Sequence, residues 1–132
     1  MTLKKTILHA LFSSVLAALA GIMYNSIYCS AFEINFKSVL NVTGIIGASI
    51  FGCVLMSIGY FVVYKWKGEK LIAALNILIA ILSFASIVGV FGFQLPMEVE
   101  SPELFPGLAV PMHFFPALSF FSLAPIFKAK TI

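Results

Sequence analysis

Four long, almost uncharged apolar segments constrain this chain more than any other feature of its sequence. They cover residues 6–32, 39–64, 71–93 and 108–127. A bilayer core about 30 Å thick needs about 20 mainly apolar residues per helix, so each segment is long enough to cross it. The segments are too long and too continuously apolar for the strands of a membrane barrel. We therefore predict an all-α polytopic membrane protein, a single antiparallel four-helix transmembrane bundle over residues 1–132.

The composition supports a bilayer as the main solvent of the chain. Of its 132 residues, 61% are hydrophobic and only 10% are charged, whereas soluble domains typically carry about 25% charged residues. Four crossings with short loops leave no room for a separate soluble domain. The densest group of basic side chains is Lys65, Lys67 and Lys70. Because it is too small to neutralise several phosphates, nucleic acid is not an expected partner.

The distribution of charge predicts the orientation, because lysine and arginine are retained on the cytoplasmic side of a membrane. Four crossings bring both termini and the middle loop to one face. The lysines on that face are Lys4, Lys5, Lys65, Lys67, Lys70, Lys128 and Lys130. The opposite face has one lysine, Lys37, and more glutamates than lysines. Its glutamates are Glu33, Glu98, Glu100 and Glu103, the last three in a predicted external loop at 94–107. We expect cytoplasmic N- and C-termini.

The compartment follows from two further observations. Lysine, isoleucine, asparagine and phenylalanine are frequent and arginine does not occur, a bias typical of AT-rich bacterial genomes, so we expect a bacterial cytoplasmic (inner) membrane. The N-terminal segment also resembles a cleavable signal peptide, with lysines, an apolar core and an A-x-A motif at residues 18–20. Its apolar run continues past Gly21 to Phe32, so we expect the segment to remain as the first crossing.

Small and polar residues predict which faces of the helices look inward. Membrane helices pack closely where small residues recur at three- and four-residue spacing, as Ala17 with Gly21 and Gly44 with Gly52 suggest. Four polar residues fall on the same stripes and are predicted to point inward: Asn25, Asn41, Asn76 and His113. The lipid-facing side of the last segment is then left to Phe114, Phe115, Leu118 and Phe121.

His113 is the main candidate for a functional residue. Ionisable side chains within membrane spans are costly and by default indicate a functional site, and Pro111 and Pro116 flank this one. The functional interpretation is a small ligand-binding vestibule open to the outside, lined by His113, Asn25, Asn41, Tyr28 and Glu103. The alternative is structural: the imidazole binds an asparagine, or a carbonyl freed by a proline, and locks the helix into the bundle.

The sequence gives little support for a metal site, a disulfide-forming cysteine pair or an enzyme active site. A zinc site needs three or four converging ligands, but His9 and His113 are expected near opposite membrane faces. Cys29 and Cys53 differ in predicted depth by more than the roughly 7 Å that a disulfide allows between Cα atoms. Hydrolase, metalloprotease, P-loop and dinucleotide motifs do not occur. We expect no metal, no cofactor and no enzymatic activity.

Two functions remain open at this point. The first is a small non-enzymatic membrane protein that acts as a subunit of a homo-oligomer or of a larger inner-membrane complex. Its partners would be the lipid bilayer and either other membrane subunits or further copies of itself. The alternative is a small carrier or receptor that binds a polar or cationic small molecule in the outward-facing vestibule near His113.

Overall fold

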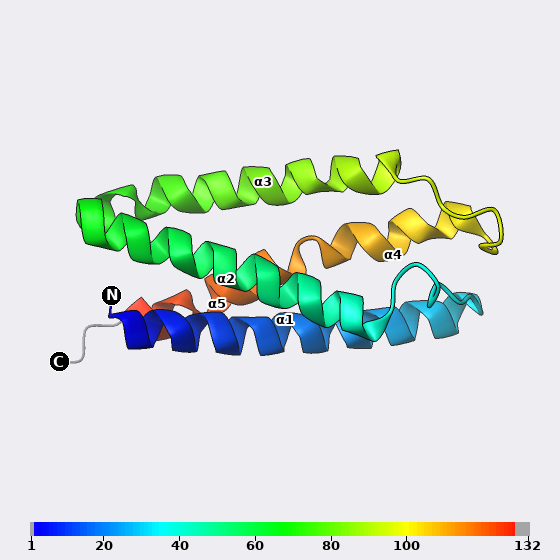
Figure 1. Cartoon of the computed structure of the whole chain (residues 1–132), viewed down its shortest axis with the longest axis horizontal. Helices are drawn as coiled ribbons and strands as arrows, with labels where there is room; N and C mark the ends of the chain where they lie inside the picture. The colour runs from blue at the N-terminus through cyan, green and yellow to red at the C-terminus, as the bar shows by residue number, and fades with distance from the viewer. Residues whose placement is uncertain (1, 129–132) are drawn as a thin grey trace.

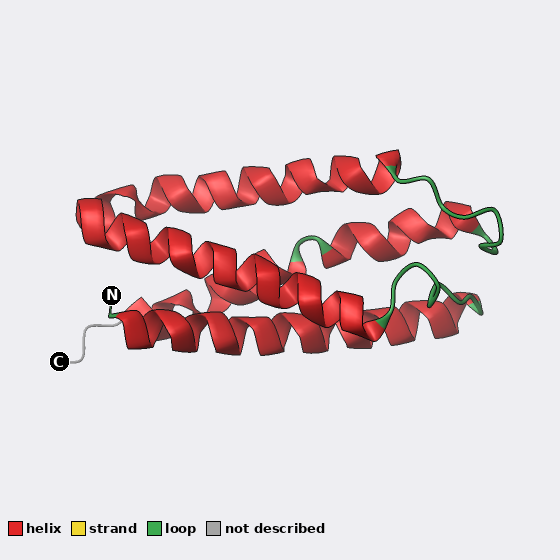
Figure 2. Cartoon of the chain, viewed as in Figure 1, coloured by secondary structure: helices red, strands yellow, loops and turns green. Residues whose placement is uncertain are grey.

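A computed structural model describes residues 2–128 of the chain, whose regular structure is entirely helical over that range (Figure 2). The elements are α1 (Leu3–Phe32), α2 (Val42–Lys67), the 3-10 turn η1 (Gly68–Leu71), α3 (Ile72–Gly92), the 3-10 turn η2 (Pro102–Leu104), α4 (Phe105–Met112) and α5 (Phe115–Lys128). Figure 1 shows α1, α2 and α3 running in alternating directions, with α4 and α5 returning toward the N-terminal end. The N-terminus, η1 and the end of α5 share one end of the molecule.

Three helical stretches are long and apolar enough to cross a membrane: Leu3–Phe32, Val42–Gly92 and Pro102–Phe127. The second has 51 residues and contains both α2 and α3, which fold back on each other at η1 (Figure 1). The all-α membrane character predicted from the sequence is therefore confirmed. Whether the chain crosses four times depends on how the stretch Val42–Gly92 sits in a bilayer.

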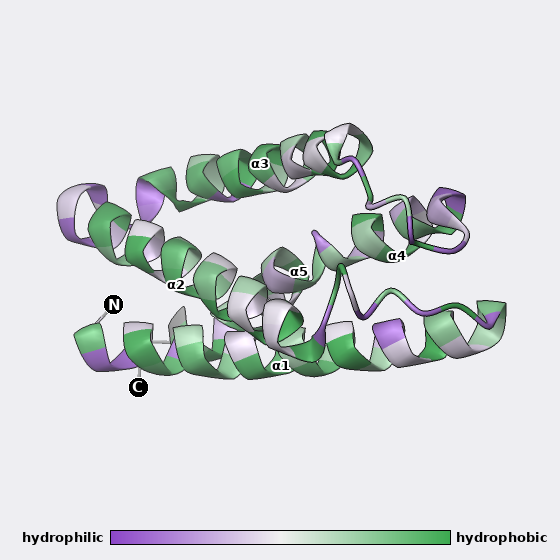
Figure 3. Cartoon of the chain, turned by 45° about the vertical axis from the view of Figure 1, so that its right-hand side comes forward, coloured by the Kyte–Doolittle hydropathy of each residue, from purple (hydrophilic) through white to green (hydrophobic). Residues whose placement is uncertain are grey.

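The hairpin between α2 and α3 forms at a glycine. Gly68 has φ of 64°, a left-handed backbone conformation that side chains with a Cβ adopt at a cost. Lys65 and Lys67 occupy the last turn of α2, where positive charge is favourable beside the helix C-terminus. Figure 3 shows hydrophilic residues gathered at this turn and in the loops of the opposite end. Lys130, which the sequence assigns to the same face, lies outside the described residues.

The last stretch begins earlier than predicted and is interrupted. Helical structure starts at Pro102 rather than at residue 108, so residues 102–107 of the predicted external loop are helical. The helix breaks after Met112, where His113 and Phe114 donate their N–H groups to carbonyls three residues back. Pro116 has no N–H to continue the regular ladder. The interruption therefore lies between Pro111 and Pro116, the two prolines that flank His113.

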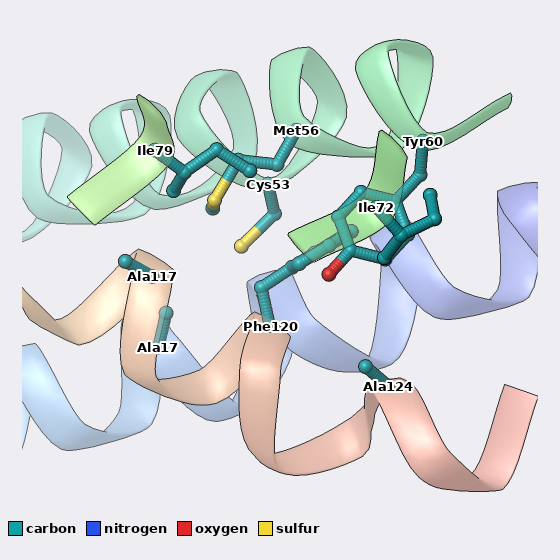
Figure 4. Packing of buried hydrophobic residues seen from close by; sticks show 9 residues of the cluster. All are labelled: Ala17, Cys53, Met56, Tyr60, Ile72, Ile79, Ala117, Phe120 and Ala124. Carbon is teal, nitrogen blue, oxygen red and sulfur yellow. The ribbon is translucent and has the colours of Figure 1, made fainter. Parts of the chain in front are cut away.

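Two clusters of buried side chains hold the helices together. At the N-terminal end, Cys53, Tyr60 and Phe120 belong to a cluster built from α1, α2, α3 and α5 (Figure 4). At the opposite end, Phe36 of the loop between α1 and α2 packs edge-to-face on Phe105 of α4, with ring centroids 5.4 Å apart. The predicted small-residue stripe of α1 is buried, and a Cβ on Gly21 would lie 2.7 Å from Cγ2 of Ile45.

The predicted stripe of α2 behaves differently. Gly44 and Ala48 are exposed and Gly52 is only half-buried, because α2 buries instead the neighbouring face that carries Ser49 and Cys53. The stripes of the two helices therefore do not meet, and that of α2 lines an open groove between α2 and α3.

Candidate functional site

An open groove lies between α2 and α3, and we call it the α2–α3 groove. Its volume is ≈ 680 Å³. Small residues of α2, leucines of α3 and the break between α4 and α5 form its walls; they include Gly44, Ala48, Gly52, Leu78, Leu82 and His113. A Cβ on Gly52 would lie 3.2 Å from Cβ of Pro116, so α2 approaches α5 closely at the floor of the groove.

His113 is half-buried and belongs to the wall of this groove. Its Nδ1 lies 2.8 Å from the carbonyl oxygen of Ala109, four residues earlier in the chain. A carbonyl oxygen only accepts hydrogen bonds, so Nδ1 carries the proton and donates. The predicted structural alternative was a bond to an asparagine or to a carbonyl freed by a proline. The observed partner is a backbone carbonyl, but the residue four positions after Ala109 is His113 itself and not a proline. His113 is nevertheless also the one predicted site residue that lines the groove.

The other predicted site residues of the first helix have partners of their own. The hydroxyl of Tyr28 donates to the carbonyl oxygen of Leu104 at 2.8 Å and so ties α1 to the start of the last stretch. Asn25 accepts a 3.6 Å hydrogen bond at Oδ1 from the thiol of Cys29 in its own helix. Neither side chain lines the groove.

Asn41 and Glu103 lie at the surface. Asn41 caps the N-terminus of α2, where its Oδ1 accepts the N–H of Gly44 at 2.7 Å. Its side chain is exposed, so the prediction that Asn41 points inward does not describe this structure. Glu103 is exposed in η2. The structure therefore does not gather the five predicted residues around one cavity.

Tyr24 makes the contact that best explains how the last stretch tolerates its prolines. Its hydroxyl donates to the carbonyl oxygen of Gly107 at 2.8 Å. In a regular helix this carbonyl would accept from the residue four positions later, which is Pro111 and has no N–H. A tyrosine of α1 thus supplies the missing donor.

His9 is the buried ionisable side chain that sequence reasoning did not single out. It is fully buried, its Nε2 lies 2.9 Å from the carbonyl oxygen of Phe120, and its ring stacks on that phenylalanine with centroids 3.9 Å apart. Because the carbonyl accepts, Nε2 carries a proton. The spacing of Thr6, His9, Ser13 and Ala17 places them on one helical face, and that spacing was the signal available in the sequence.

Hydrogen bonds from side-chain hydroxyl groups connect the helices in the N-terminal half of the bundle. Ser57 of α2 donates to the carbonyl oxygen of Thr6 at 3.4 Å, and Tyr60 of α2 donates to Oδ1 of Asn76 in α3. These bonds join α1 to α2 and α2 to α3. Asn76 therefore faces a neighbouring helix, as predicted, and the polar interior of this half serves to connect helices.

The described residues include no group of three or more histidine, cysteine, aspartate or glutamate side chains that could hold a metal ion. Cys29 and Cys53 are both free thiols, Cys53 buried and Cys29 half-buried. Within the part of the chain that the structure describes, the groove is thus the feature best suited to take up a ligand.

Comparison with known proteins adds no relative. No protein-family model matches the sequence, and neither a curated protein nor a solved structure matches the chain.

Proposed function

We propose that this chain is a non-enzymatic integral membrane protein that crosses a bacterial cytoplasmic membrane four times and acts as a subunit of a homo-oligomer or of a larger complex. The lengths of α2 and α3 support four crossings. With 26 and 21 residues, these helices extend about 39 and 31 Å at about 1.5 Å per residue, close to the thickness of a bilayer core. The turn between them carries Lys67, Glu69 and Lys70, which hydrocarbon would not solvate.

The same arrangement supports cytoplasmic termini. Lys4 and Lys5 at the start of α1 lie at the same end of the molecule as the lysines of the α2–α3 turn (Figure 1). Glu33, Glu98 and Glu103 belong to segments at the opposite end. With lysine retained on the inner side, the N-terminal end is the cytoplasmic one.

One observation carries the proposal of a subunit: glycines lie on outer helix faces with nothing packed against them. A Cβ added to Gly47 or Gly92 would meet no atom within 4 Å, and neither glycine lines the α2–α3 groove. In hydrocarbon, glycine on a helix surface favours close approach of another helix, whereas acyl chains gain nothing from it. Only 11% of the most apolar window of Val42–Gly92 is buried inside the chain, against 44% for α1. The surface of α2 and α3 is therefore where a partner helix fits.

The experiment is native mass spectrometry of the protein released from the membrane in a mild detergent. The proposal expects one reproducible stoichiometry, either several copies of the chain or a fixed set of partner polypeptides. Gly47→Ile should dissociate that assembly because it fills the surface against which the partner packs. Val54→Ile is the matched control on the same helix, since Val54 is 40% exposed and already carries a branched side chain. A monomer without partners at every detergent concentration would contradict the proposal.

The second candidate is a small carrier or receptor for a polar or cationic solute, and one observation favours it: His113 lines the groove. His113→Phe distinguishes the two candidates. Loss of solute binding with normal folding supports the carrier or receptor, while unchanged binding together with a loss of stability leaves the imidazole with a structural role only.

A further inference from the structure

The α2–α3 groove has the dimensions of a small-molecule site. Its volume of ≈ 680 Å³ falls within the range of about 300–1,000 Å³ that is usual for ligand pockets. The α2 side of the groove runs from Gly44 to Gly59, which is about 22 Å at the rise of a helix.

The wall is apolar and uncharged. Its described lining residues include no lysine and no glutamate, and His113 is the titratable side chain among them. A cationic or anionic ligand would therefore lose its hydration without gaining a counter-charge, which is costly in hydrocarbon. The wall therefore disfavours the cationic solute of the second candidate function and favours a neutral molecule with a long alkyl part.

Two residues at the break between α4 and α5, Met112 and His113, line this wall and carry hydrogen-bond acceptors. Nδ1 of His113 donates to the carbonyl oxygen of Ala109, so in the neutral ring Nε2 bears a lone pair and accepts. Met112 also lines the groove, and its carbonyl is the one to which Pro116 has no N–H to donate. Because these groups can accept a hydrogen bond but not donate one, they favour a ligand that carries a hydrogen-bond donor.

The groove opens sideways, between the helices, rather than toward water. Phe51 and Leu55 of α2 and Leu78 and Leu82 of α3 belong to its lining and are also exposed large hydrophobic residues. In a membrane these side chains would meet acyl chains. A molecule dissolved in the bilayer could therefore enter without leaving hydrocarbon.

We propose that the α2–α3 groove binds a neutral, lipid-soluble molecule that consists of an alkyl chain and a hydroxyl group, with the hydroxyl donating to Nε2 of His113. This goes beyond the proposed subunit function and does not depend on it. The alkyl chain lies along Gly44, Ala48 and Gly52, where the missing side chains leave room for it.

The test uses the full-length protein in lipid nanodiscs with ¹⁵N-labelled histidine, which gives signals from only His9 and His113. The probe is 1-dodecanol, and the comparison compound is 1-methoxydodecane, which has the same alkyl chain but no donor. We expect a saturable shift of the His113 Nε2 resonance with the alcohol and none with the ether. The His9 resonance should stay in place, because that ring is buried outside the groove.

Two variants make the result specific to this site. His113→Phe should weaken dodecanol binding about tenfold, the effect of one lost hydrogen bond, as measured by competition with a radiolabelled alcohol. Ala48→Leu fills the groove and should abolish saturable binding even if the first variant is poorly folded. Ala73→Leu is its control, since Ala73 is exposed on α3 and does not line the groove.

Three outcomes would overturn the proposal. Equal binding of the ether and the alcohol would remove the role of Nε2 as an acceptor. A shift that grows in proportion to the alcohol without saturating would reduce the effect to partition into the bilayer. Unchanged binding in the Ala48→Leu protein would place the alcohol somewhere other than the groove.

Discussion

Replacing His9 with alanine tests whether the polar interior near the N-terminal end holds the bundle together. His9 is fully buried, stacks on Phe120 at 3.9 Å between ring centroids, and makes a 2.9 Å hydrogen bond to the carbonyl oxygen of the same residue. It also faces Tyr60 edge-on, with ring centroids 6.1 Å apart. One side chain of α1 therefore contacts both α2 and α5, and its removal should loosen both contacts.

The expected cost follows from these contacts. Truncating a buried aromatic ring to alanine costs about 3–5 kcal/mol in soluble cores, where transfer from water contributes. In a bilayer the separated helix still lies in hydrocarbon, so packing and hydrogen bonding remain as the main losses. We expect His9→Ala to lower the free energy of unfolding by about 2 kcal/mol. His9→Phe keeps a ring but loses the bond to the carbonyl, and should cost about 0.5–1 kcal/mol.

The assay is reversible unfolding by SDS in mixed micelles, followed by near-ultraviolet circular dichroism. Leu11→Ala is the matched control on the same helix, because Leu11 is 56% exposed and its loss should cost less than about 0.5 kcal/mol. Equal destabilisation by His9→Ala and Leu11→Ala would refute the buried position of the ring. Equal destabilisation by the phenylalanine and alanine variants would show that the hydrogen bond, and not ring packing, dominates.

Three further predictions concern the contacts of α1 and the two thiols. Gly107→Ala should destabilise the protein by about 1–3 kcal/mol in the same titration, because its Cβ would overlap a tyrosine hydroxyl; Gly89→Ala, whose Cβ meets nothing within 4 Å, should not destabilise it. Tyr24→Phe removes the donor of the carbonyl that a proline leaves open and should cost about 1 kcal/mol, and no loss of stability would show that water or lipid replaces it. A maleimide should label the half-buried Cys29 in the folded protein and reach the fully buried Cys53 only after SDS denaturation, so equal labelling rates would contradict the packing around α2.

Hydropathy alone predicted the helices, because in a bilayer the length of an apolar run nearly determines the length of the helix. The first segment was predicted to end at Phe32, where α1 ends, and residues 71–93 became Ile72–Gly92. The start of the last stretch was missed, since Pro102 and Glu103 look like loop residues. Proline is accepted in the first turn of a helix, where its missing N–H has no partner in any case.

The predicted site depended on depth and helical phase, which the sequence constrains less. Because the last crossing was predicted to start at residue 108, His113 was expected near the outer boundary of the membrane. The observed stretch starts at Pro102, so His113 lies near the middle of Pro102–Phe127. Asn41 has the spacing of an inward-facing residue, but an asparagine three residues before a glycine also fits a helix cap, and the cap is what forms. Tyr28 was assigned to a vestibule and instead joins α1 to the last stretch.

The break after Met112 also bears on how the chain is assembled by the ribosome and translocon. Neither α4, with 8 residues, nor α5, with 14, is long enough to cross a membrane core about 30 Å thick by itself. The most apolar 18-residue window of their stretch has a mean hydropathy of 1.5, the lowest of the three stretches, compared with 2.6 for Val42–Gly92. Because α1 supplies phenolic donors for the carbonyls of this stretch and is synthesised before it, α1 lowers the cost of inserting it. The tyrosines that donate these hydrogen bonds are thus already part of the chain when the last stretch is inserted.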